Sequence, residues 1–150
     1  MRLIALFSSA LMAFAIDASA AATTPSYDDA RKLADSLSSF VAQTGTWDKK
    51  PAAVRMSELR RADGLVKEAE RLFGTSPLGS LGQCVAAAYS MRYYVGHLND
   101  LARILEGARP VSSAADLYAP MFTAFNFGDQ YRACKGQIET LDAPTPKRAK

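Results

Sequence analysis

Apolar residues recur at steps of three and four along most of this chain, which is the spacing of one face of an α-helix. Four stretches carry the pattern, residues 26–44, 51–73, 81–106 and 113–142. Between the first two, residues 47–50 are expected to form a loop. No stretch shows the sustained alternation of apolar and polar positions that predicts a half-buried strand. The sequence therefore predicts an all-α protein, with an antiparallel four-helix bundle as its architecture.

Two of the predicted helices begin with capping signals, and the last one contains residues that disfavour a continuous helix. Ser26 is followed three residues later by Asp29, which is the pattern of a capping box with a short acidic side chain, and the same pattern begins at Ser113. In the last stretch, Pro120 lacks the backbone N–H that an α-helix needs, and residues 125–128 end in a glycine. We therefore expect a kink or a break in the last helix.

The last two helices are predicted to form a disulfide-linked hairpin. The stretch 81–106 is the most apolar of the four, so we expect it at the centre of the bundle, covered on more than one side. If it turns back at Arg109 and Pro110, residues equally far from this turn face each other across the hairpin. Cys84 and Cys134 are equidistant from Arg109. In an oxidising compartment the two cysteines are then expected to form a disulfide.

The start of the chain has the pattern of a cleaved secretory signal. Arg2 precedes an apolar run over residues 3–16, and the run is followed by the small-x-small sequence of residues 18–20, which suits a signal peptidase. The run is shorter than the roughly 20 residues that span a bilayer, so no membrane span is expected. Residues 1–20 are therefore predicted to be removed, and the remainder to be periplasmic or secreted.

The remaining chain is predicted to contain a helical domain, residues 21–142, and a basic disordered tail, residues 143–150. The formal net charge is +3, and Lys147, Arg148 and Lys150 all lie in the tail. The domain itself has no clustered basic surface of the kind that binds nucleic acid, so no nucleic-acid partner is expected. Attraction of the tail to anionic lipid or cell wall is left open.

The residues of common catalytic and metal sites are missing from the sequence. His97 is the only histidine, so neither an HExxH zinc motif nor a multi-histidine metal cluster can be built. Cys84 and Cys134 do not form a CxxC motif, and the glycines match no P-loop. We expect no enzymatic activity, no metal and no cofactor. An enzyme with an unfamiliar site stays open as an alternative, because a missing motif does not exclude activity.

One pair of residues supports a different alternative, a b-type haem-binding bundle. His97 and Met121 are equidistant from Arg109, so the hairpin places them at the same level. A histidine and a methionine facing each other inside a helical bundle are an axial ligand set for haem iron. A packed core around an isolated histidine is the simpler interpretation of the same residues.

Aromatic residues concentrate in the predicted hairpin and suggest a binding surface. The candidate patch combines Arg92, Tyr93 and Tyr94 from the third stretch with Phe122 and Phe127 from the fourth. Aromatic residues and arginine are enriched at protein–protein interfaces, although the same rings also fill cores. The leading hypothesis is an exported, non-enzymatic helical protein that binds another protein, as an inhibitor, an immunity-type protein or a chaperone-like factor.

Overall fold

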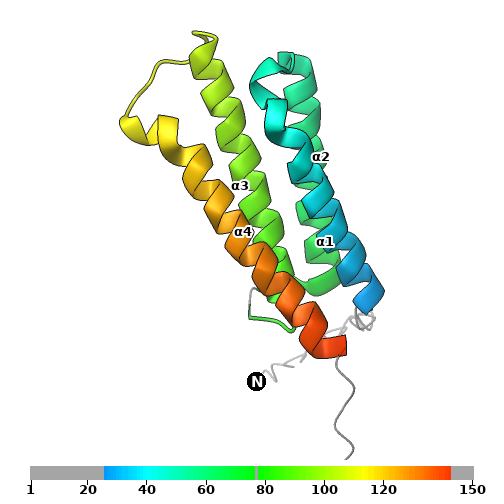
Figure 1. The fold of residues 1–150 in the computed structure, drawn as a ribbon. Coiled ribbons are helices and arrows are strands. Elements are labelled where there is room, and N and C mark those ends of the chain that lie inside the picture. Colours follow the sequence, from blue (N-terminus) through cyan, green and yellow to red (C-terminus); the bar gives the residue numbers. More distant parts are fainter. Residues whose placement is uncertain (1–25, 77, 143–150) are drawn as a thin grey trace, which may run out of the picture.

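In the residues that the computed structural model describes, there are four α-helices and one short 3-10 helix, and successive α-helices run antiparallel (Figure 1). The structure describes residues 26–76 and 78–142, and these contain no strand. The elements are α1 (Tyr27–Ala42), η1 (Gln43–Lys49), α2 (Ala52–Phe73), α3 (Gly82–Leu105) and α4 (Ala114–Asp142). The predicted all-α antiparallel four-helix bundle is confirmed.

Two predicted segments cannot be compared with this fold. The signal sequence, residues 1–20, and the basic tail, residues 143–150, lie outside the described residues. Within residues 26–76 and 78–142, no helix is both long enough and apolar enough to cross a membrane.

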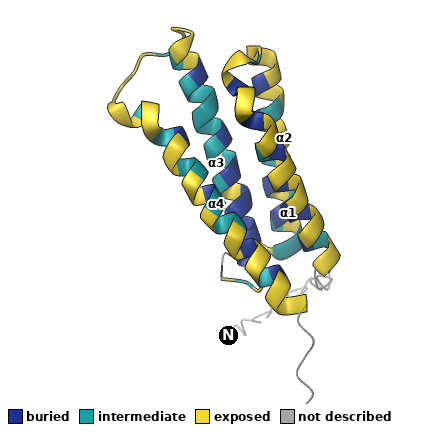
Figure 2. Cartoon of the chain, viewed as in Figure 1, coloured by how far each residue is buried: buried dark blue, intermediate teal, exposed yellow. Residues whose placement is uncertain are grey.

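Helix α3 is the central element of the bundle, as its apolar sequence predicted. It contacts α1, α2, α4 and η1, whereas α4 packs mainly on α3. Met91, Val85 and Val95 of α3 are fully buried, together with Leu37 and Phe40 of α1. Burial follows the helical period on each element, because only the stripe that faces a neighbour is removed from water (Figure 2).

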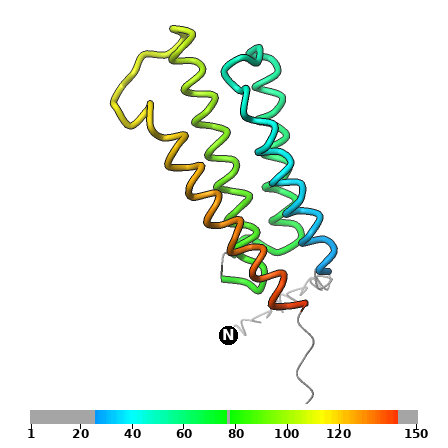
Figure 3. Tube along the Cα trace, viewed as in Figure 1, coloured from blue at the N-terminus to red at the C-terminus, as the bar shows by residue number. Residues whose placement is uncertain are grey.

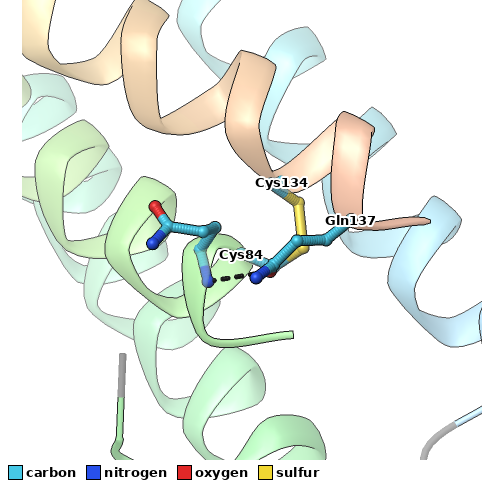
Figure 4. The surroundings of a disulfide bond; sticks show 4 residues. Cys84, Cys134 and Gln137 are labelled. Carbon is cyan, nitrogen blue, oxygen red and sulfur yellow. Dashed lines mark hydrogen bonds between the residues drawn. A yellow bond between two sulfur atoms is a disulfide. The ribbon is translucent and has the colours of Figure 1, made fainter. Parts of the chain in front are cut away.

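The hairpin of α3 and α4 has the predicted register. Cys84 and Cys134 form a disulfide between the two helices, with their Cα atoms 4.5 Å apart (Figure 4). Beside it, the backbone N–H of Gln83 donates to the side-chain oxygen of Gln137 at 3.1 Å, which holds the first turn of α3 against α4. The connection between the helices, residues 106–113, is centred on the predicted turn.

Helix α1 meets α4 only near the C-terminal end of α4. The N-cap of α1 is Ser26, whose hydroxyl oxygen accepts a hydrogen bond from the backbone N–H of Asp29, as the capping pattern predicted. The Tyr27 hydroxyl donates to the Leu141 carbonyl at 2.6 Å, and Arg31 pairs with Asp142. From this end the two helices diverge, and the N-terminal half of α4 stands apart from α1 and η1 (Figure 3).

Two local expectations are corrected by the structure. Of the kink or break expected in the last helix, the break is absent, because α4 continues through both Pro120 and residues 125–128. Pro120 lies in the second turn, where its missing N–H removes one hydrogen bond, and its ring is buried. Residues 47–50 are not a simple loop, because Trp47, only 2% exposed, anchors the 3-10 helix η1 in the core.

Candidate protein-binding surface

The N-terminal half of α4 carries a stripe of exposed apolar side chains. Cys134 faces α3 through the disulfide, and Pro120 and Phe127, at intervals of two helical turns from it, are buried on the same face. Among the described helices only α3 packs on this half of α4, so its remaining faces are open to solvent in that part of the chain. We name as the α4 stripe the five residues that are between 43% and 68% exposed there, Leu117, Tyr118, Met121, Phe122 and Phe125.

The α4 stripe is uncharged and is bracketed by acidic residues that already have partners. Residues 117–128 contain no Asp, Glu, Lys or Arg. At one end, Asp116 accepts hydrogen bonds from the backbone N–H groups of Ser112 and Ser113, and these bonds lower the pKa of its carboxyl group. At the other end, the first charged residue is Asp129, which is paired on the helix surface.

Helix α3 carries one exposed ring at the level of the α4 stripe, but on another side of the hairpin. Tyr93 is 61% exposed. It lies nine residues after Cys84, which is two and a half helical turns, so it points away from the side of α3 that the disulfide joins to α4. The α4 stripe alone is called the apolar face below. Its only hydroxyl is that of Tyr118, so it offers contact area rather than reactive groups.

The structure divides the patch that the sequence predicted. Tyr93 and Phe122 are both exposed, but only Phe122 belongs to the apolar face. Phe127 is buried and stacks on a neighbouring ring of α4, whereas Tyr94 is half-buried against the core. Arg92 is turned toward α2, where it pairs with Asp63. The exposed side chains that sequence reasoning left out of the patch are Leu117, Tyr118, Met121 and Phe125, of which Tyr118 and Phe125 are at helical spacing from Phe122.

The haem hypothesis depends on His97 and Met121, and the structure leaves both of them partly open to solvent. Met121 is 49% exposed and belongs to the α4 stripe, and His97 is half-buried on α3. Haem ligation by this pair stays a prediction. Within the described part of the chain, no three side chains of His, Cys, Asp or Glu are grouped closely enough to hold a metal ion.

A second apolar feature lies at the same end of the bundle, between η1 and α3. It is an open pocket of about 290 Å³, and its walls include Trp47 of η1 and, from α3, Tyr94, Leu98, Leu101 and Leu105. The indole N–H of Trp47 is buried and has no hydrogen-bond partner among the described residues. The sequence prediction missed this pocket because it placed Trp47 in a loop.

Both apolar features lie at the end of the bundle where α3 stops and α4 starts. The apolar face is the larger of the two in exposed side chains, and it is continuous along α4. Comparison with known proteins identifies no relative, because no family model, no curated protein and no solved structure matches the chain. What the chain does is therefore inferred from its own surface.

Proposed function

We propose that this chain is an exported, non-enzymatic protein that works by binding another protein molecule through its apolar face. The observation that carries the proposal is the exposure of Tyr118, Phe122 and Phe125 on one side of α4, each more than half open to water. Single apolar residues on a surface are ordinary, but a contiguous group of rings marks an interaction site. Export is supported by the disulfide between Cys84 and Cys134, because disulfides persist in oxidising compartments.

The residue types in the apolar face suit a protein partner better than a small ligand. Small-molecule sites are concave and enclose most of their ligand. The α4 stripe instead lies on the outside of a helix that packs mainly on α3. Tyr, Phe and Met are enriched in the central part of protein interfaces, where charged residues are depleted. The absence of charge over residues 117–128 matches that composition.

Photocrosslinking in the native host tests the proposal at single positions. A photoreactive phenylalanine analogue replaces Phe122, and in a matched control it replaces Ala133, which is also exposed on α4 but lies beyond the stripe. We expect a crosslinked adduct of discrete mass from position 122 and none from position 133. Equal labelling at both positions, or no protein adduct at position 122, would contradict the proposal.

A further inference from the structure

We propose that the occupant of the apolar face is a second copy of this chain, so that the protein is a dimer joined through two α4 helices. The inference rests on the proposed function, since it names the partner of the same surface. In a two-fold dimer the same patch is used by both copies, and each contact is made twice. The apolar face meets three requirements of such a contact, which are its charge, its area and its shape.

The first requirement is that two identical faces meet without repulsion. Near the axis of a two-fold contact a charged residue meets its own copy, and like charges across an interface cost several kcal/mol. Residues 117–128 carry no charged side chain, and Asp116 beside them is hydrogen-bonded to its own loop. The apolar face is therefore electrostatically compatible with itself. It also carries no charge that would select a foreign partner of opposite sign.

The second requirement is area. The three exposed rings, Tyr118, Phe122 and Phe125, are between 56% and 68% exposed. An aromatic side chain has about 200 Å² to bury, so these rings expose about 380 Å² in one copy. Two copies then bury about 750 Å² through the rings. The side chains of Leu117 and Met121, which are 43% and 49% exposed, raise this area toward the roughly 1,000 Å² of the smallest specific interfaces.

The third requirement is a shape that a second helix can match. The uncharged segment 117–128 is about 18 Å long at the rise of an α-helix, and of the helices that the structure describes only α3 packs on it (Figure 1). Two such segments laid antiparallel would join two hairpins into one four-helix layer, with the rings between them. Phe122 lies near the middle of the segment, so it lies close to the two-fold axis and to its own copy.

The charge argument gives a specific experiment on the exported protein with its disulfide intact. Sedimentation equilibrium over a range of concentrations is measured for the wild type, Phe122→Glu, Phe122→Lys and the control Ala133→Glu. We expect the wild type and the control to reach twice the monomer mass. Each variant at position 122 should raise the dimer Kd at least about 100-fold. An equimolar mixture of the two should restore a mixed dimer, because opposite charges then meet near the axis.

Other occupants of the apolar face give different results. A wild type that stays monomeric at all concentrations overturns the dimer, as does a Phe122→Glu variant that dimerises as the wild type does. A monomer whose intact mass still includes residues 1–20 also overturns it, because a retained apolar leader would then compete for the face. Circular dichroism of each variant shows whether a monomeric variant is still folded. The mixed dimer is a second control, because misfolded chains would not form it.

The crosslinking experiment separates failure of this inference from failure of the proposed function. An adduct at position 122 with twice the monomer mass supports both proposals. An adduct with a different protein, combined with a monomeric purified chain, supports protein binding and overturns the second copy as occupant. No adduct and no dimer overturn both.

Discussion

Arg55 of α2 is buried, and its guanidinium forms a bidentate ion pair with the carboxylate of Glu106, the residue that follows α3. The two nitrogen–oxygen distances are 2.7 and 2.8 Å, although Arg55 is only 1% exposed. The same guanidinium donates to the Lys50 carbonyl at 2.7 Å. One side chain therefore ties the start of α2, the segment before it and the end of α3 together. This is the end of the bundle that also carries the apolar face.

Replacing Arg55 by alanine should destabilise the protein by about 3 kcal/mol, because it leaves a cavity where a fully buried side chain was packed and removes the donor to the Lys50 carbonyl. The exposed Arg60, on the same helix, is the matched control. Arg60→Ala should change the free energy of unfolding by less than about 0.5 kcal/mol. Urea unfolding followed by circular dichroism measures both. Equal effects of the two substitutions would show that the buried side chain of Arg55 adds nothing.

The Arg55 pair also predicts an acid-sensitive stability. The hydrogen bond from Arg55 lowers the pKa of Glu106 below its ordinary value of 4.5. A carboxyl group of this kind binds its proton more readily in the unfolded chain. Its contribution is therefore complete above pH 4.5 and is lost as the pH falls through the lower, folded-state pKa. Asp116, whose pKa is lowered by two backbone N–H groups, contributes in the same direction.

We expect the free energy of unfolding to decrease on acidification below pH 4.5, and to decrease less steeply in Glu106→Gln. Glutamine keeps a side-chain oxygen for Arg55 but does not titrate. Urea unfolding at a series of pH values measures the two slopes. Glu139, exposed on α4, gives the control substitution Glu139→Gln. Parallel pH profiles for the wild type and Glu106→Gln would refute the assignment.

The hairpin could be predicted from sequence because two independent patterns agree on it. The apolar period of residues 81–106 predicted a central helix, and the turn at Arg109 then fixed which residues face each other. Cys84 and Cys134 satisfied that register without having been used to set it, and the structure joins them. Local spacing and a long-range contact thus supported the same arrangement, which is why the prediction was reliable here.

The features that sequence reasoning missed depend on tertiary contacts. In the sequence, Arg55 looks like the other charged residues of α2. The one indication of its burial is that it lies four residues before Leu59, so it falls on the same side of the helix as the buried residues. Trp47 lies in a segment without a helical apolar period, so its burial depends on α3 and not on its own neighbours. The exposure of the α4 stripe could not be predicted either. Its apolar residues would be core residues if α1 ran alongside the whole of α4.

Loss of the disulfide should lower stability without destroying the fold. The cysteines are 50 residues apart, and opening a loop of this size costs about 4 kcal/mol in the chain-entropy description. We therefore expect the double variant Cys84→Ala, Cys134→Ala to unfold at a lower urea concentration than the wild type. Its far-UV circular dichroism should be unchanged, since the contact between α3 and α4 extends well beyond the disulfide. A chain that is unfolded without the bond would contradict this division of roles.

Phe125 and Phe127 should behave as opposites, although they are two residues apart on the same helix. Phe127 is 8% exposed and Phe125 is 68% exposed. Phe127→Ala should cost about 3 kcal/mol of stability, because it opens a cavity between α3 and α4. Phe125→Ala should change the stability of the isolated monomer by less than about 0.5 kcal/mol. It should instead weaken association at the apolar face about tenfold or more, which is the effect of removing a central interface ring.

Urea unfolding at high dilution measures the stability of the two variants, and sedimentation of the folded proteins measures their association. If Phe127→Ala weakened association more than Phe125→Ala at equal folded fraction, the contact surface would have to include the side of α4 that faces α3. The hairpin would then have to open before it could bind, which the intact disulfide between Cys84 and Cys134 opposes.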